Sequence, residues 1–286
     1  MPWWFWLILG LAVYVGFAAA CWAIARNPRG DLGFGILYRI GRAYVFRFHG
    51  LRVEGREHLR RAAEMVGKIP SGNRGEGPLV IVANHTAGVD PLLISAVVPY
   101  DVRWIMAEDM RLPALEWFWK YNRVIFVSRG GKREGTGIRD AVRHLEQGGV
   151  IGIFPEGGIE RPPRMILPFL RGLSLIISKT DAVVLPVVID GTPQVDPAWA
   201  SLWRPSRSRL RFLEPVRFSE LGVRSGEIMP ELRRRFLEAT GWPPNDEVGD
   251  HPEPAPFEAP TVVMEPGEGN AGGPRPRAGY ARRKSG

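Results

Sequence analysis

The sequence predicts an α/β protein with a largely parallel sheet flanked by helices, preceded by an N-terminal transmembrane helix and an amphipathic helix. Short continuous apolar runs recur through the middle of the chain, and helical patterns separate them. An uncharged stretch of 24 residues near the start predicts the membrane helix. With 286 residues, 45% of them hydrophobic, the chain is neither a wholly disordered polymer nor a transporter with many spans.

Residues 2–25 predict a transmembrane anchor. They carry no charge, and as a helix they would cover about 36 Å, enough to cross a hydrocarbon core of about 30 Å. Tryptophans near both ends, with Arg26 and Arg29 directly after the run, place the following domain on the cytoplasmic side. A cleaved signal peptide is the alternative, because residues 18–21 resemble a lipoprotein cleavage site. The run is too long for a signal-peptide core, and no basic residue precedes it.

Residues 32–44 predict an amphipathic helix. Ile36, Leu37 and Ile40 fall on one helical face, and arginines fall on another. This helix either lies on the membrane surface or packs against the soluble domain. Its position beside the anchor favours the membrane surface.

Residues 45–240 contain the alternating pattern. Four continuous apolar runs predict strands buried on both faces: 79–83, 124–127, 150–154 and 183–189, with 45–53 as a further candidate. Residues 137–147 predict a helix ended by Gly148-Gly149. Strand, helix and strand in succession predict a parallel sheet, whose functional residues lie beyond the carboxyl ends of the strands.

Composition separates the tail from the body. Residues 241–286 contain nine prolines and eight glycines, which predicts disorder. Residues 1–240 carry 33 basic and 23 acidic side chains, a balance that suits anionic lipid or a phosphorylated substrate. Nucleic acid is not an expected partner, because no recognised nucleic-acid module accompanies the charge. One cysteine and scattered histidines predict no internal disulfide and no metal site.

A histidine follows the first apolar run, in Asn84-His85-Thr86-Ala87-Gly88-Val89-Asp90-Pro91. His85 and Asp90 can meet if the chain turns at Gly88, and Asp90 followed by proline also predicts a helix N-cap. An imidazole held by a carboxylate can take a proton from a hydroxyl. The alternative is a structural histidine beside an ordinary cap.

Charged residues follow the next two runs. Arg129, with Lys132 and Arg133, lies among glycines and forms either an anion site or an exposed loop. Glu156 follows the third run, where it either accepts a hydrogen bond from a hydroxyl or occupies a solvated turn. No Walker spacing and no Gly-x-Ser-x-Gly elbow is present, which disfavours nucleotide hydrolysis and serine hydrolase chemistry.

Together these blocks resemble the glycerolipid acyltransferase family, which includes 1-acylglycerol-3-phosphate (lysophosphatidic acid) acyltransferases. The resemblance covers roughly residues 45–220 and implies an acyltransferase domain over 45–240. It implies that His85 deprotonates the acceptor hydroxyl and that Asp90 holds His85. The implied substrate-binding residues are Asn84 in the same block, Phe126 and the phosphate-contacting Arg129 in the second, Phe154, Pro155, Glu156 and Gly157 in the third, and Pro186 in the fourth, near the acyl donor.

Two positions depart from the family pattern. Gly158-Ile159 stands where the family has Thr-Arg, and Arg123 stands where the second block begins with glycine. A phosphate-binding arginine is therefore missing from its usual place. Arg161 and Arg164, in the adjoining turn, are the candidate substitutes.

The resemblance implies a membrane-bound enzyme of phospholipid biosynthesis that moves a fatty acyl group to a hydroxyl of a lysophospholipid, converting lysophosphatidic acid to phosphatidic acid. The expected donor is an acyl thioester, acyl-CoA or acyl-carrier protein, and no other cofactor is expected. Direct transfer agrees with the lack of an activated serine or cysteine. The alternatives are a lysolipid acceptor without a phosphomonoester, such as an aminolipid or glycolipid, and a non-catalytic membrane adaptor.

Overall fold

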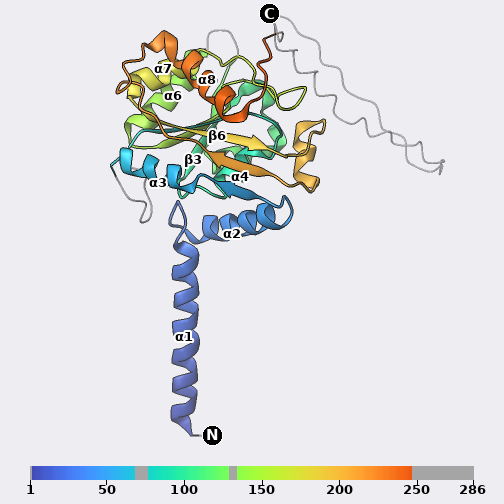
Figure 1. Ribbon diagram of the computed structural model, residues 1–286. Helices are drawn as coiled ribbons and strands as arrows, with labels where there is room; N and C mark the ends of the chain where they lie inside the picture. The colour runs from blue at the N-terminus through green and yellow to red at the C-terminus, as the bar shows by residue number, and fades with distance from the viewer. Residues whose placement is uncertain (1, 68–76, 129–133, 247–286) are drawn as a thin grey trace, which may run out of the picture. The chain divides into compact units, whose positions relative to one another are not determined.

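A computed structural model describes residues 2–67, 77–128 and 134–246 (Figure 1). Within these residues the body is a sheet between two layers of helices. The layer drawn below the sheet contains α2 (Leu32–Arg47), α3 (Arg56–Met65) and α4 (Asp90–Ser95), and the layer above it contains α6 (Glu134–Glu146), α7 (Gly172–Thr180) and α8 (Ile228–Thr240). Residues 129–133 and the part of the predicted tail from 247 onward lie outside the described residues.

The sheet confirms the predicted fold class. Its described strands are β1 (Arg52–Glu54), β2 (Leu79–Ala83), β3 (Val102–Ala107), β4 (Ile125–Val127), β5 (Val150–Ile153), β6 (Val183–Asp190) and β7 (Arg209–Phe212). Their order is β1-β7-β6-β2-β5-β3-β4, and every neighbouring pair is parallel except β6 with β7. The carboxyl ends of β2 and β5 therefore lie side by side, since Leu79 pairs with Val150.

Strand alternation divides the core in two. Leu79 and Ile81 of β2 belong to the cluster packed with α2, α3 and α4, whereas Val80 and Val82 belong to the cluster packed with α6, α7 and α8. All five β2 residues are buried. This two-sided burial explains the continuous apolar run in the sequence.

The strand expected over residues 45–53 was wrong. Residues up to Arg47 continue α2, and Val45 turns into the core as part of that helix. Gly50, with a φ of +52°, then reverses the chain before the three residues of β1. Two strands, β3 and β7, were not predicted. In β7, arginines alternate with the buried Leu210 and Phe212, whereas β3 has a single arginine, Arg103, followed by an apolar stretch over residues 104–107.

Short elements complete the body. The described 3₁₀ helices are η1 (Glu108–Met110), η2 (Pro113–Leu115), η3 (Ala198–Trp203) and η4 (Ser225–Glu227), and α5 (Glu116–Tyr121) is a short α-helix. Three aromatic residues of α5 and η3 are more than half exposed: Trp117, Trp199 and Trp203.

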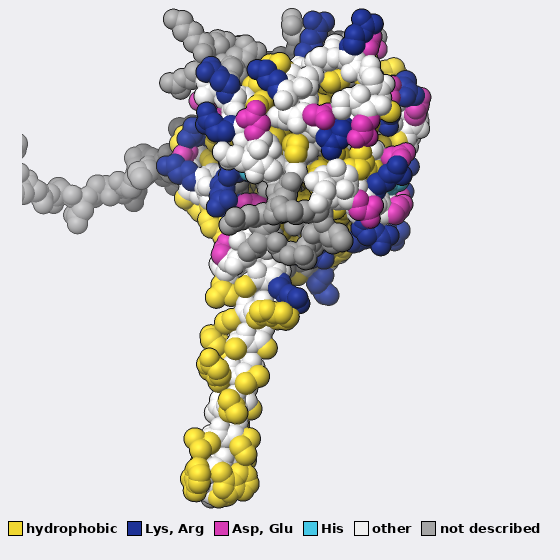
Figure 2. Space-filling model, turned by 90° about the vertical axis from the view of Figure 1, so that its left-hand side faces the viewer, with side chains coloured by type: hydrophobic (Ala, Val, Ile, Leu, Met, Phe, Trp, Pro, Cys, Tyr) yellow, Lys and Arg dark blue, Asp and Glu magenta, His cyan; other side chains and the backbone are white. Residues whose placement is uncertain are grey.

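The N-terminal helix α1 (Trp3–Ala25) is apolar and long enough to cross a membrane, and none of its residues is buried. Figure 2 shows hydrophobic side chains along its length. It meets α2 closely, because a side chain at Gly35 would lie 2.2 Å from the carbonyl oxygen of Ile24. The Arg39 guanidinium also donates to the Ala23 carbonyl at 2.6 Å. Ile36, Leu37 and Ile40 on α2 are about half exposed or more.

Candidate active site

His85 and Asp90 meet just beyond the carboxyl end of β2. The distance from His85 Nδ1 to Asp90 Oδ2 is 2.9 Å. Asp90 is completely buried, while the His85 side chain is 19% exposed. Because Nδ1 is engaged by the carboxylate, Nε2 is the ring nitrogen left to exchange a proton with a substrate.

The Asp90 carboxylate is held by the turn that precedes it. Oδ2 also accepts from the backbone N–H groups of Thr86 (2.7 Å) and Ala87 (2.8 Å), and the Thr86 hydroxyl lies 3.2 Å from both oxygens. The expected N-cap was therefore wrong. Asp90 is the first residue of α4, the cap position belongs to Val89, and the carboxylate binds the preceding turn instead of the helix amides.

Asn84 joins the ends of two strands. Its amide nitrogen donates to the Ile189 carbonyl at 3.0 Å, and its amide oxygen accepts from the Ile189 N–H at 2.8 Å. The side chain thus continues the hydrogen-bonding pattern between β2 and β6. Asn84 is completely buried, so it fixes the strand end from which His85 projects.

Aromatic rings support the imidazole. The His85 and Phe154 rings stack with centroids 4.1 Å apart and planes 16° apart, and Trp104 stacks on the other side of Phe154 at 5.0 Å. Trp104 also donates from its indole nitrogen to the Ser95 hydroxyl at 3.0 Å. Gly152 makes room for this ring, because a Cβ there would lie 2.7 Å from Trp104.

Two buried carboxyl groups lie in the turn after β5. Glu156 is fully buried, and neither carboxylate oxygen has a hydrogen bond of good geometry among the described residues. Burial, followed by the charge of Glu160, raises the pKa of Glu156 well above its ordinary value; the nearby backbone amide of His85 offsets part of that rise. Burial likewise raises the pKa of Glu160 to about 7, although its Oε1 accepts from the Met165 N–H at 3.1 Å.

The same turn brings Arg161 to the His85 block. The Glu160 N–H donates to the His85 carbonyl at 2.8 Å, and Arg161 Nη1 lies 3.2 Å from the Thr86 carbonyl and 2.6 Å from Gln194 Oε1. Arg161 Nη2 is buried, makes no hydrogen bond among the described residues, and lies 3.8 Å from Asp196 Oδ1. Arg164, by contrast, pairs with Asp190 at 3.2 Å and is 65% exposed.

The remaining predicted site residues are spread more widely. Gly157, with a φ of +69°, closes a turn in which its N–H donates to the Phe154 carbonyl, and the Pro155 carbonyl accepts from Leu170. Pro186 is buried in β6 opposite Val82. Phe126 lies on β4, three strand spacings or about 14 Å from β2, beneath the Arg111 guanidinium. Arg129 lies outside the described residues.

Sequence reasoning missed three contributors to this site. Trp104 carries no motif signal, because it stands in an apolar stretch, residues 104–107, that belongs to none of the predicted strands. Glu160 lies just past the third block, where its burial is not visible in the sequence. Thr86 sits inside the first block, between His85 and Asp90. Its hydroxyl contacts the Asp90 carboxylate and lies 2.7 Å from the Thr192 hydroxyl. A polar residue between two predicted partners was the signal from which its role could have been predicted.

Comparison with known proteins assigns this arrangement to a family. Residues 50–190 match the sequence model described as Acyltransferase, a range that contains His85, Asp90 and the turn after β5. The chain carries a domain of the acyltransferase family.

Relatives of this acyltransferase domain have several names. The chain is 26% identical over 132 residues to N-acylphosphatidylethanolamine synthase of Arabidopsis thaliana, covering 42% of this chain and 46% of the relative. It is 25% identical over 145 residues to 1-acyl-sn-glycerol-3-phosphate acyltransferase of Helicobacter pylori, covering 50% and 61%. It is 24% identical over 139 residues to a protein named Taffazin of Dictyostelium discoideum, covering 44% and 48%. The chain thus spans about half the length of these curated relatives.

A solved structure has the same fold. The 1-acyl-sn-glycerophosphate (LPA) acyltransferase PlsC of Thermotoga maritima superposes with a TM-score of 0.53 at 26% identity, covering 72% of this chain and 75% of that chain.

Proposed function

We propose that this protein is a membrane-bound acyltransferase that moves a fatty acyl group from an acyl thioester to a hydroxyl of a lysophospholipid, with lysophosphatidic acid as acceptor and phosphatidic acid as product. The observation that carries the proposal is the 2.9 Å contact between His85 Nδ1 and the buried Asp90 carboxylate at a strand end. The family match and the relatives that carry acyltransferase names support it.

In this mechanism His85 is the general base. Nε2 takes the proton of the acceptor hydroxyl as its oxygen attacks the thioester carbonyl carbon, and Asp90 stabilises the resulting imidazolium. The tetrahedral intermediate then collapses, the carbon–sulfur bond breaks, and the thiolate leaving group takes the proton back. The Phe154 ring holds the imidazole plane during both proton transfers.

Arg161 replaces the missing phosphate-binding arginine in this proposal. Its guanidinium reaches the carbonyl of Thr86, the residue next to His85, and its Nη2 makes no hydrogen bond among the described residues and lies 3.8 Å from Asp196 Oδ1. Arg164 is engaged by Asp190 and is more exposed. Guanidinium groups bind phosphate through paired hydrogen bonds, which suits a lysophosphatidic acid headgroup.

The N-terminal helices support the proposed membrane location. An exposed apolar helix of 23 residues has the length and composition of a membrane anchor, and the exposed apolar side chains of α2 suit the lipid surface beside it. Arg26 and Arg29 after α1 favour a cytoplasmic location for the body.

The test is acyl transfer by the purified full chain, given labelled acyl-CoA or acyl-carrier protein with lysophosphatidic acid or a phosphate-free lysolipid. We expect product from lysophosphatidic acid, and loss of product in a folded His85→Ala variant. Equal activity of that variant would refute the catalytic role of His85, and absence of product from every acceptor with either donor would favour a membrane adaptor. Arg161→Gln should raise the KM for lysophosphatidic acid, whereas Arg164→Gln, the matched control, should not.

A second acceptor class has one specific observation in its favour. Gly158-Ile159 occupies the place of the family's Thr-Arg, so the usual phosphate contact is missing. If product forms only from an aminolipid or glycolipid acceptor, and Arg161→Gln leaves its KM unchanged, the chemistry of His85 stands and the acceptor is phosphate-free.

A further inference from the structure

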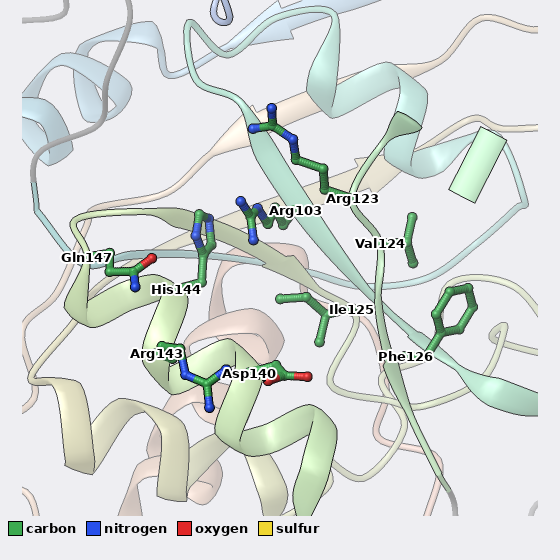
Figure 3. A pocket seen from close by; sticks show the side chains of 9 residues that line it. All are labelled: Arg103, Arg123, Val124, Ile125, Phe126, Asp140, Arg143, His144 and Gln147. Atoms are coloured by element: carbon green, nitrogen blue, oxygen red, sulfur yellow. Dashed lines mark hydrogen bonds and ion pairs between the residues drawn. The ribbon is translucent and has the colours of Figure 1, made fainter. Parts of the chain in front are cut away.

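A basic pocket lies at the opposite end of the sheet from His85. It has a volume of about 420 Å³ and opens between β3, β4 and the end of α6 (Figure 3). Arg103 stands near the start of β3 and Arg123 just before β4, whereas His85 follows the carboxyl end of β2. Arg103 lies four residues, about 13 Å, before the carboxyl end of β3, and two strand spacings, about 10 Å, separate β3 from β2, so Arg103 is remote from His85. Phe126, which pairs with Met106, extends the pocket wall along β4.

The side chains around the pocket carry more positive than negative charge. One Asp101 oxygen pairs with Arg29 at 2.7 Å and the other lies 3.4 Å from Arg123. Arg143 pairs with Asp140 at 3.2 Å. Four guanidinium groups around the pocket, those of Arg29, Arg103, Arg123 and Arg143, thus face these two carboxylates.

Arg103 is the cation without a partner. Among the described residues it makes no hydrogen bond or ion pair, and its Nε is buried. Figure 3 shows its guanidinium reaching into the same space as Arg123 and His144. A partly buried cation without a bonded partner is costly to the fold, and a bound anion would reduce that cost.

His144 lies in the same positive electrostatic field. Its Nε2 is buried without a hydrogen-bond partner. Burial first, and then the charge of Arg103, lower the pKa of His144 to about 4. The imidazole is therefore neutral at neutral pH, and its unpartnered nitrogen leaves room for a polar ligand atom.

Residues beside the pocket contact Arg29, in the segment that follows the apolar helix α1. Arg29 lies four residues after the end of α1, shares Asp101 with Arg123, and donates to the Tyr121 carbonyl at 2.8 Å. Lipid phosphates lie where a membrane helix leaves the hydrocarbon region. Trp117 and Phe118 lie on α5, the helix that ends at the Tyr121 contacted by Arg29, and they are 67% and 41% exposed, as is common for aromatic residues at a membrane interface.

We propose that this pocket binds the phosphate of an anionic membrane lipid and so holds the body to the bilayer at a second point besides α1. The guanidinium groups of Arg103 and Arg123 would grip the phosphate, and Gln147 on the pocket wall would add an amide donor. This site is independent of the acceptor that His85 would deprotonate.

The experiment measures binding of dioctanoyl phosphatidylglycerol to the full chain in a non-ionic detergent. This phosphodiester is neither the proposed acceptor nor its product, so the outcome does not depend on acyl transfer. Dioctanoyl phosphatidylcholine, inorganic phosphate and adenosine 3′,5′-bisphosphate are the comparison ligands. The variant is Arg103→Gln with Arg123→Gln, and the matched control is Arg209→Gln with Arg224→Gln, which removes the same charge from exposed arginines on β7 and before η4.

We expect the pocket variant to bind phosphatidylglycerol at least about tenfold more weakly than wild type, and the control to bind like wild type. Arg123→Gln alone, at a half-exposed residue, should weaken binding in the same direction if the double variant does not fold. Equal affinity in pocket and control variants would overturn the proposal. Tight, variant-sensitive binding of the bisphosphate without phosphatidylglycerol binding would assign the pocket to a soluble phosphate and overturn the lipid assignment.

Discussion

Replacing Asp90 by asparagine separates chemistry from folding at the candidate active site. Three N–H donors converge on Asp90 Oδ2: His85 Nδ1, Thr86 N and Ala87 N. An asparagine oxygen in that place accepts all three, and its NH₂ group then faces the Thr86 hydroxyl, 3.2 Å from Oδ1 in the wild type. The variant keeps the turn and the imidazole orientation but loses the negative charge.

The magnitude follows from that charge. The Asp90 carboxylate stabilises the imidazolium that forms during proton transfer, so Asp90→Asn should lower the rate of acyl transfer by up to about 100- to 10,000-fold, the usual contribution of general acid–base catalysis. Its melting temperature should stay within a few degrees of wild type.

Asp90→Ala, in contrast, should lower the stability of the protein. It leaves the three buried donors without an acceptor, at about 1 to 3 kcal/mol each. We therefore expect a loss of at least about 3 kcal/mol in the free energy of unfolding, or about 6 °C or more in melting temperature for a domain of this size. Thermal unfolding of both variants beside steady-state acyl transfer tests the reasoning, and an Asp90→Asn protein with activity within about threefold of wild type would refute it.

Three further variants test the groups around this site. The pKa of Glu160 is about 7 in the fold, against an ordinary value of 4.5, so the fold favours the protonated form of this side chain. The contribution of Glu160 to the stability of the protein is therefore complete below about pH 4.5 and is lost as the pH rises to about 7. Glu160→Gln should therefore be within about 1 kcal/mol of wild type at pH 5 and exceed its stability at pH 8 by up to about 3 kcal/mol in urea unfolding; an unchanged difference between the two pH values contradicts this. Gly152→Ala would place a Cβ 2.7 Å from Trp104 and should lower stability by about 1 to 3 kcal/mol, measured by thermal unfolding. Phe154→Leu removes the ring stacked on His85 and should lower kcat up to about tenfold with little change in KM, whereas a change in KM alone would indicate a role in substrate binding.

The sequence predicted the central strands well because burial on both faces leaves a clear signal. β2, β4, β5 and β6 are continuous apolar runs, and their bounds differ from the predicted ones by at most one residue. β7 was not predicted, because Arg209 and Arg211 separate its core-facing residues and break the run. β3 was not predicted although residues 104–107 form an apolar stretch, and its four middle residues are only partly buried. The strand expected at 45–53 failed because a helix face that enters the core has the same apolar composition as a short strand.

Contacts between residues that are close in the sequence were the predictable part of the candidate site. His85 and Asp90 are five residues apart, and one turn at Gly88 lets them meet. The stacking of Trp104 on Phe154 joins two strands 50 residues apart, and the approach of Arg161 to Thr86 spans 75 residues. No spacing along one chain encodes such contacts, so they emerge only from the fold.

The alternation along β2 also decides from which direction a lipid can arrive. Odd-numbered residues of this strand face the layer that contains α2 and α4, and His85 continues that parity, as Phe154 does beyond β5. Removing a single residue from β2 would invert the parity and turn the imidazole toward α6 and α7, where the sheet is closed by apolar packing. An acceptor that keeps its acyl chain in the bilayer would then have no path to the base, although every residue of the motif would still be present.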